Sequence, residues 1–242
     1  MKVQFPKKRE IERYLHIREG SLDHIPHYAI NSALLAIANI RKMEKEKLFR
    51  PGLYYIVLSD LCRSTQAAAR LGQDLNKRRV ESFILTCIEA LGNIQPINYF
   101  LPIREIGDAV LIIFSSFKDA HNWWLTMHEW LAVSNGRWQE KLSKEQFAAF
   151  SLNAKTVVHL GEVAYSDDNI PVALAVNQVF KIEKLFGSGE LGLTYPALLA
   201  AVPILRDLNL RARSLKSVHL PGDKHPTATY VVDRWKNTVI LR

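Results

Sequence analysis

Two short apolar segments, each of which brings one aspartate to the end of a predicted strand, constrain this chain more than any other feature. The first run, 54–58, leads to Asp60, and the second aspartate, Asp108, directly precedes the apolar run 109–114. A carboxylate at a strand end beside a tight turn packs poorly, but it is well placed to bind a hard cation such as Mg²⁺ together with substrate phosphates. The sequence therefore predicts a metal site of two aspartates that serves phosphoryl chemistry.

Composition and charge narrow the class of protein without choosing a partner. The chain has 242 residues, is 48% hydrophobic and carries a formal charge of +8, which is enough apolar material for a full core. A basic balance suits a polyanion: nucleic acid, an anionic membrane surface or a nucleoside triphosphate. Cys62 and Cys87 belong to no CxxC or Cys/His cluster, so we expect a reduced, cytoplasmic compartment. We expect neither a signal peptide nor a membrane span, because the sequence lacks the apolar stretches that these segments need.

The order of apolar patterns predicts one main domain after a helical extension. Residues 7–48 mix charges with apolar residues at helical spacing, and Pro51-Gly52 marks a boundary; we assign 1–50 to an N-terminal helical extension and 51–242 to the main domain. Within it we expect strands at 53–59, up to Arg104, at 109–114 and at 154–160, and helices at 65–91, 118–133 and 172–186, with a short strand, a helix and a hairpin afterwards. This βαββαβ order is typical of an α+β, ferredoxin-like sandwich with helices on one face of the sheet.

The tryptophan-rich segment 118–133 places Trp123, Trp124, Met127 and Trp130 at spacings of three and four. This spacing favours a helix face that packs in the core. Asn135-Gly136 predicts the end of that helix, and 137–150 is interpreted as a connecting helix or loop.

Four motifs, in this order, resemble those of class III nucleotidyl cyclases. They are Asp60-Leu-Cys-Arg-Ser-Thr65 after a strand, Ile106-Gly-Asp-Ala-Val110, Val158-His-Leu-Gly-Glu-Val163, and Ala175-Val-Asn177 with Lys181-Ile-Glu183 one turn later. The resemblance covers about residues 53–232 and implies the class III cyclase domain. It also implies attack of the ribose 3'-oxygen on the α-phosphorus of a nucleoside triphosphate, with pyrophosphate as the leaving group.

The resemblance assigns roles to the aspartates and to the turn after the first strand. Asp60 and Asp108 are similar to the metal-binding aspartates of the family, the backbone carbonyl of Leu61 would be a further ligand, and the cofactors would be two Mn²⁺ or Mg²⁺ ions. Backbone N–H groups around Ser64 and Thr65, at a helix start, are aimed where phosphates would lie. Simple N-capping of the helix explains Ser64 and Thr65 equally well.

Further positions carry the nucleotide roles of the family. Asn177 is similar to the asparagine that orients the ribose, and Lys181 stands where the family usually has an arginine that contacts the phosphate in the transition state. Lysine keeps that charge but loses the bidentate fork. Arg63 and Lys216 are further candidates for phosphate binding, with plain surface charge as the alternative.

The base-recognition positions depart most from the family. Arg104 stands where adenylate cyclases carry lysine, and Ile170 stands where they carry aspartate. Arg104 only donates, so it favours a base edge with a carbonyl, which means uracil or guanine. Guanine would also need an acidic acceptor for its N1–H and N2–H₂ groups, and Glu105 should point to the face opposite Arg104. Uracil therefore fits better, although Asp167 or Asp168 would supply such an acceptor if the loop before the helix is aligned with a different gap. Of Tyr54 and Tyr55, one is expected to stack on the base, and we assign Tyr55 to substrate binding.

These substitutions resemble the bacterial pyrimidine cyclases of the Pycsar anti-phage systems, and specifically the uridylate cyclases. That resemblance implies conversion of UTP to 3',5'-cyclic UMP, a second messenger for antiviral defence, by a homodimer with sites at the interface. The alternatives are a purine (adenylate or guanylate) or cytidylate cyclase. A different class is a nucleotide- or RNA-binding ferredoxin-like module without catalysis. DNA and RNA are not expected partners, because RNP-type aromatic strands are not evident and paired carboxylates repel phosphates in the absence of metal.

Overall fold

The computed structural model describes residues 51–91, 99–103, 108–165, 171–172 and 174–232. The predicted N-terminal extension (1–50) lies outside these residues, as do the proposed base-reading residues Arg104 and Ile170 and the alternatives Glu105, Asp167 and Asp168.

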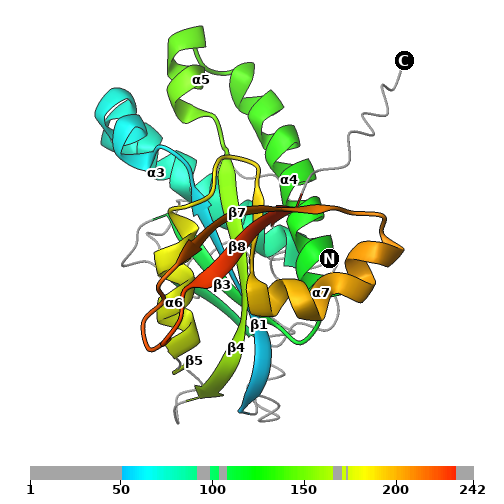
Figure 1. The fold of residues 1–242 in the computed structure, drawn as a ribbon. Helices are drawn as coiled ribbons and strands as arrows, with labels where there is room; N and C mark the ends of the chain where they lie inside the picture. Colours follow the sequence, from blue (N-terminus) through cyan, green and yellow to red (C-terminus); the bar gives the residue numbers. More distant parts are fainter. Residues whose placement is uncertain (1–50, 92–98, 104–107, 166–170, 173, 233–242) are drawn as a thin grey trace, which may run out of the picture.

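The main domain has its strands and helices in the predicted order, with one short strand, β5, that the sequence did not predict (Figure 1). The first part comprises β1 (Gly52–Leu61), α3 (Ser64–Leu91), β2 (Tyr99–Ile103), β3 (Ala109–Phe114), α4 (Phe117–Gln139), α5 (Lys144–Phe150) and β4 (Ala154–Tyr165). The second part comprises β5 (Pro171–Val172), α6 (Leu174–Glu183), β6 (Leu191–Thr194), α7 (Tyr195–Asp207), β7 (Ala212–Val218) and β8 (Thr227–Val232).

One sheet joins these strands in the order β2-β3-β1-β4-β6-β8-β7, and β5 pairs with β4. The first four strands, β2-β3-β1-β4, are antiparallel to their neighbours, which is the strand order that a ferredoxin-like βαββαβ unit produces. Strand β6 then pairs with β4 in parallel. The predicted α+β class and ferredoxin-like core are confirmed. Strand β1 has partners on both sides, so Asp60 lies near the end of an interior strand of the sheet.

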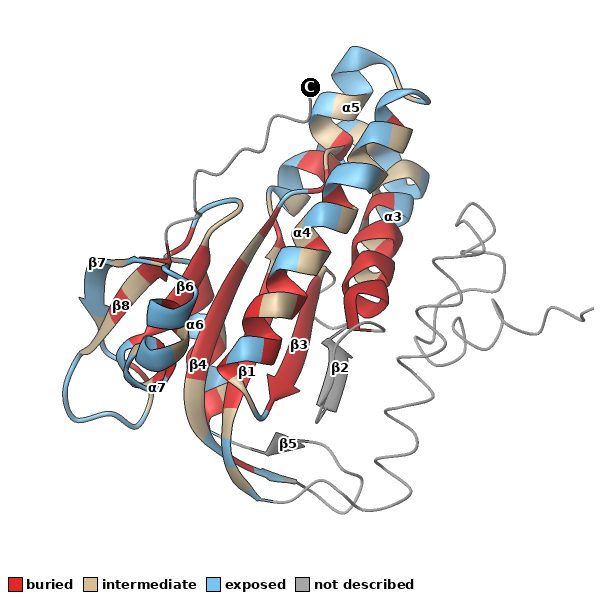
Figure 2. Ribbon diagram, turned by 90° about the vertical axis from the view of Figure 1, so that its right-hand side faces the viewer, coloured by how far each residue is buried: buried red, intermediate tan, exposed pale blue. Residues whose placement is uncertain are grey.

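Helices cover both faces of the sheet, which corrects the expectation of helices on one face. Tyr55 and Val57 of β1 belong to the core under α3 and α4, whereas Ile56 and Leu58 belong to a second core under α6. This division follows from the alternation of side chains along a strand. Figure 2 shows the buried residues concentrated on the sheet and on the sides of α3 and α4 that face it. The βαββαβ pattern did not include α6, because α6 follows the fourth strand.

The tryptophan-rich helix packs mostly as predicted but ends later than predicted; of the residues expected on its core face, Trp130 is only half-buried and lies outside the core. Trp123, Trp124 and Met127 are buried in the core under α4, while α4 continues through Asn135 and Gly136 to Gln139. The amide of Asn135 accepts from the backbone N of Leu152 at 2.7 Å and donates to its carbonyl O at 2.9 Å. Because its side chain is satisfied by tertiary contacts, Asn135 does not compete for its own helix backbone.

Candidate active site

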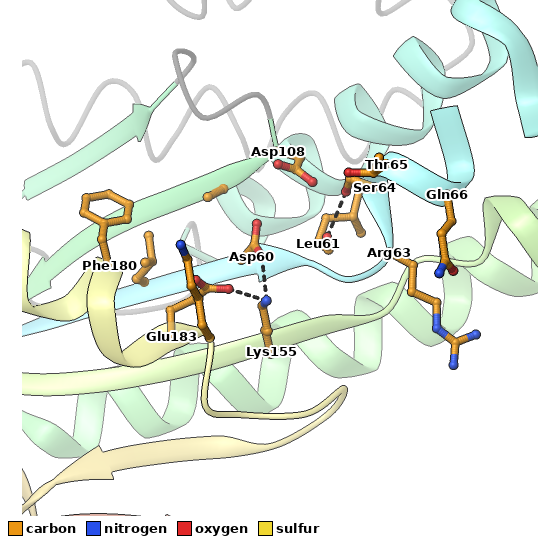
Figure 3. Close-up of a pocket in the computed structure, with 13 residues that line it drawn as sticks. Asp60, Leu61, Arg63, Ser64, Thr65, Gln66, Asp108, Lys155, Phe180 and Glu183 are labelled. Carbon is orange, nitrogen blue, oxygen red and sulfur yellow. Dashed lines mark hydrogen bonds and ion pairs between the residues drawn. The ribbon is translucent and has the colours of Figure 1, made fainter. Parts of the chain in front are cut away.

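The two aspartates come together at the ends of neighbouring strands. Asp60 pairs with Ala109 in the β1–β3 ladder, so Asp108 directly precedes the residue opposite Asp60. The backbone N of Leu61 donates to the carbonyl O of Asp108 at 3.1 Å. Both carboxylates line a pocket of about 490 Å³, and Figure 3 shows them facing it from β1 and from the start of β3.

A lysine that the sequence reasoning missed lies between carboxylates in this pocket. Lys155 of β4 stands opposite Asp60 in the β1–β4 ladder, and its Nζ lies 3.1 Å from Oδ2 of Asp60. The same ammonium pairs with Glu183 at the end of α6. Figure 3 shows Lys155 between Asp60 and Glu183, with dashed lines to both. One cation therefore already neutralises part of a crowded group of acids.

Burial dominates the electrostatics of both aspartates. Burial raises the pKa of Asp60 to about 7, with help from a hydrogen bond to Glu183 and from the charge of Asp108, against the opposing contact with Lys155. Burial also raises the pKa of Asp108 to about 6, although the charges of Arg79 and Lys155 oppose this shift. Both carboxyls therefore bind a proton more tightly than an exposed aspartate does, and an added cation would favour their ionised forms.

The turn between β1 and α3 is held by two side chains, those of Ser64 and Arg79. Arg63 has a left-handed backbone (φ 63°), and the hydroxyl of Ser64 donates to the carbonyl O of Leu61 at 2.9 Å. From α3, the buried Arg79 donates from Nη2 to the carbonyl O of Cys62 at 2.6 Å and from Nε to that of Phe150 at 2.9 Å. These contacts fix the turn in which phosphate-binding N–H groups are predicted.

The predicted site residues fall into two groups. Arg63, Ser64 and Thr65 line the pocket with the aspartates and Leu61, although Figure 3 shows the side chain of Arg63 extending away from the carboxylates. The other group consists of exposed residues that are not part of the pocket lining: Asn177 and Lys181 on α6, and Lys216 on β7. Within one chain, the structure therefore assembles the metal and phosphate residues but not the predicted ribose and transition-state residues.

The assignment of Tyr55 to substrate stacking is wrong. Its side chain is 9% exposed, and its ring packs against Phe117 of α4 with centroids 5.9 Å apart. Because side chains alternate along β1, Tyr55 points to the face opposite Asp60. Tyr54 lies on the same face as Asp60 and packs at the edge of the core under α6.

The residues of the pocket fit a hard divalent cation. Two half-buried carboxylates with raised pKa values and the Leu61 carbonyl provide oxygen ligands of the kind that Mg²⁺ and Mn²⁺ take. Among the described residues, no group of three or more His, Cys, Asp or Glu side chains is placed to hold a metal. The protein ligand set is therefore sparse, as in sites where substrate phosphates and water complete the coordination.

Three contributors to the site escaped the sequence reasoning for different reasons. By the alternation of side chains along β4, Lys155 lies on the same buried face as Val157. A lysine among apolar residues on a buried face indicates a functional site, and the sequence alone could have shown this. Glu183 was noted only as part of a motif. Arg79 lies fourteen positions beyond Thr65 in a long helix, and nothing in the spacing reveals that it reaches back to the turn.

Comparisons with solved structures place this architecture among cyclase catalytic domains. The adenylyl cyclase CyaB from P. aeruginosa superposes with a TM-score of 0.57 at 16% identity, covering 78% of this chain and 98% of that chain. The guanylyl cyclase Cya2 gives 0.58 at 18% identity, covering 78% and 96%. The guanylate cyclase domain of RhGC from Catenaria anguillulae, in complex with GTP, gives 0.54 at 15% identity, covering 76% and 97%.

No protein-family model and no curated protein sequence matches the chain. The structural likeness therefore concerns the fold: this chain has the mixed α+β fold of class III adenylyl and guanylyl cyclase catalytic domains. In the part of the chain that the structure describes, no helix is long and apolar enough to cross a membrane.

Proposed function

We propose that this protein is a nucleotidyl cyclase, which converts a nucleoside triphosphate to a 3',5'-cyclic nucleotide and pyrophosphate. The observation that carries the proposal is the convergence of Asp60 and Asp108 on one pocket of a fold shared with adenylyl and guanylyl cyclases. Cyclisation needs a group that lowers the cost of an alkoxide-like 3'-oxygen and positive charge around the phosphates. Both requirements match the content of this pocket.

The chain's own residues would bind and orient the triphosphate. The turn from Leu61 to Thr65 leads into α3, so its backbone N–H groups and the positive end of the helix dipole favour an anion there. Lys155 and Lys184 add positive charge from the pocket wall. Asp60, Asp108 and the Leu61 carbonyl would hold two divalent ions, Mg²⁺ or Mn²⁺, which when bound supply charge neutralisation for the 3'-oxygen and the phosphates.

A homodimer would complete the site. Asn177 and Lys181 lie on the exposed side of α6, and Lys216 lies on the exposed edge strand β7. We infer that these residues enter the pocket of a second copy, where Asn177 orients the ribose and Lys181 contacts the phosphate. A twofold arrangement of this kind produces two equivalent sites, each with residues from both chains.

We favour UTP as the substrate and cyclic UMP as the product. The support is the donor-only Arg104 and the absence of an acidic residue at Ile170, together with the resemblance to Pycsar uridylate cyclases. The role as a second messenger in anti-phage defence rests on the same resemblance. A purine nucleotide is an equally good alternative, because the superposed structures are adenylyl and guanylyl cyclases and include complexes with GTP and with ATPalphaS.

The test is to incubate the purified protein with each of the four NTPs plus Mg²⁺ or Mn²⁺ and to identify the cyclic product by mass spectrometry. Asp60→Ala and Asp108→Ala should abolish turnover while the circular dichroism spectrum stays unchanged. The matched control is Asp74→Ala, since Asp74 is exposed on α3 outside the pocket. No cyclic product from any NTP would overturn the proposal and leave a nucleotide-binding module as the alternative.

A further inference from the structure

A series of buried hydrogen bonds links α6 to the sheet, on the same face as Asp60 and Lys155. Nδ1 of His159, on β4, lies 2.9 Å from Oγ1 of Thr194, and its Nε2 lies 2.9 Å from Oε1 of Gln178 on α6. Nε2 of Gln178 donates to the carbonyl O of Pro221 at 2.8 Å and to Oδ1 of Asp223 at 3.1 Å. The series thus joins β4, β6, α6 and the loop between β7 and β8.

The Pro221 carbonyl, at one end of this series, determines which group donates and which accepts in each hydrogen bond. The Pro221 carbonyl only accepts, so the amide nitrogen of Gln178 faces it and the amide oxygen faces His159. Nε2 of His159 is therefore the donor, and the neutral ring accepts from the Thr194 hydroxyl through Nδ1. Burial lowers the pKa of His159, against the opposing effects of Gln178 and Asp223, which agrees with a neutral ring.

Burial makes these bonds costly to lose. His159 is 5% exposed, Gln178 is 6% exposed and Thr194 is fully buried. A buried polar group that loses its partner pays its full desolvation cost. Helix α6 also lies very close to β4 here, because a Cβ on Gly161 would collide with Cβ of Ala175. These hydrogen bonds and this close packing together fix the position of α6 against β4.

The elements that this series joins are those that carry the second group of predicted site residues. Asn177 directly precedes Gln178 in α6, and Lys181 follows one turn later. Strand β7, which carries Lys216, leads into the loop that contains Pro221 and Asp223. The oxygen of Asp223 that does not face Gln178 accepts from the hydroxyl of Thr227 at 2.9 Å, at the start of β8.

We propose that His159, Gln178 and Asp223 are positioning residues, which hold α6 and the β7–β8 hairpin as one unit that completes the site of the partner copy. This inference rests on the proposed cyclase function and its shared site. The three residues would touch neither substrate nor metal, and they act on turnover through the placement of Asn177, Lys181 and Lys216. A displacement of about 1 Å at such groups costs up to about a hundredfold in rate.

Mixed dimers separate this role from a general loss of stability. In a dimer of an Asp60→Ala chain with an Asn177→Ala chain, one site keeps an intact Asp60 and an intact Asn177, so activity should return from near zero. Gln178→Met removes the hydrogen bonds at similar side-chain volume. Alone, Gln178→Met should lower kcat by about tenfold or more. In a dimer with an Asp60→Ala chain, one site combines an intact Asp60 with a correctly placed Asn177, so activity should return at that site. In a dimer with an Asn177→Ala chain, neither site has a correctly placed Asn177, so no activity should return.

The matched control is Asn135→Leu, which removes two comparable hydrogen bonds that tie α4 to the segment before β4 on the opposite face of the sheet. Asn135→Leu should lower the melting temperature, but it should restore activity in a mixture neither as Asp60→Ala does nor as Asn177→Ala does. Asp223→Ala, whose parent side chain is exposed, is a second variant that spares the core, and it should behave as Gln178→Met with a smaller loss.

Each remaining outcome decides the matter. Normal kcat in both Gln178→Met and Asp223→Ala, or restoration of activity when Gln178→Met is mixed with Asn177→Ala, would overturn the positioning role alone. Failure of the reference mixture of Asp60→Ala with Asn177→Ala would instead overturn the shared site, and the inference would fall with it.

Discussion

Lys155 is the residue that most changes the interpretation of the pocket. Although burial opposes its charged form, the contacts with Glu183 and Asp60 raise the pKa of Lys155 above its ordinary value. The ammonium therefore compensates two carboxylates on neighbouring elements. In the chain without metal it performs part of the neutralisation that a divalent ion would supply.

Removal of this ammonium should destabilise the metal-free protein. Lys155→Met leaves Asp60 and Glu183 as facing acids, and breaking a partly buried pair costs about 1–3 kcal/mol in the free energy of unfolding. Urea denaturation in the presence of a chelator measures the change, with Lys144→Met on the exposed start of α5 as the control. A loss no larger than that of the control would show that Lys155 does not compensate the acids.

The raised pKa values of Asp60 and Asp108, about 7 and about 6, predict how metal binding depends on pH. Metal must displace protons, so the apparent affinity for Mn²⁺ should rise from about pH 5 to about pH 7.5 and then level off. In the metal-free protein the folded state binds these protons more tightly than the unfolded state does. Its free energy of unfolding should therefore fall as pH rises from about 4, near the ordinary pKa of aspartate, to about 7.

Calorimetric titration of Mn²⁺ at several pH values checks this prediction, and Asp60→Asn should flatten the curve. An affinity that does not change across that window would contradict the assignment of the two carboxyls as ligands.

At this scale the sequence predicted what depends on local context. Asp60 and Asp108 stand at strand ends, and they line the pocket together with the turn residues Leu61, Arg63, Ser64 and Thr65. Lys155 depends on the register of β4 against β1, and Glu183 depends on the packing of α6, so neither could be placed from spacing. Tyr55 was assigned to the wrong face of β1. Alternation separates the two faces of a strand, but both faces of β1 are apolar and buried, so the sequence pattern does not indicate which face holds the site.

Among the elements, helix α3 both follows the turn after β1 and helps to hold that turn. It bends at Gly72, where the backbone is non-helical (φ 72°, ψ 170°). The part of α3 after this bend carries Arg79, whose side chain reaches the turn that precedes the helix. The buried guanidinium contacts carbonyls of the Cys62 turn and of the end of α5. A glycine tolerates this backbone, whereas another residue would be strained there.

Arg79→Lys should loosen the turn while keeping the charge. Lysine cannot contact both carbonyls with the fixed fork of arginine, so we expect a loss of about 1–3 kcal/mol in the free energy of unfolding and weaker binding of a non-cyclisable NTP analogue. Chemical denaturation and equilibrium binding measure the two effects. Unchanged analogue binding in a folded, destabilised variant would show that the turn does not depend on Arg79.

Element types and order were largely predictable, because the segments are long and periodic and their turns are clear. The end of α4 was not, since Asn135 finds its hydrogen-bond partners at Leu152, seventeen residues further along the chain. The second helical layer was also missed. Only the three-dimensional sheet order shows that α6 returns to the face that carries Asp60.

For the whole molecule, the proposed division of the site between two copies makes activity a function of concentration. Dilution should lower the specific activity as dimers dissociate, because a lone chain lacks Asn177 and Lys181 in its own pocket. Activity assays over a dilution series, with sedimentation velocity on the same samples, test this. Constant specific activity in samples that sediment as monomers would contradict the shared site. The sequence could predict the fold of one chain, but assembly depends on surfaces that no periodicity describes.

The central position of β1 has a consequence for amide hydrogen exchange. Backbone amides of a strand paired on both sides open mainly through unfolding of the whole domain, whereas those of an exposed edge strand open through smaller fluctuations. Amides near Asp60 should therefore exchange among the slowest in the protein, and those of the edge strand β7 should exchange faster. The strand that carries Asp60 is then as durable as the domain itself, while the strand that carries Lys216 can yield within an intact molecule.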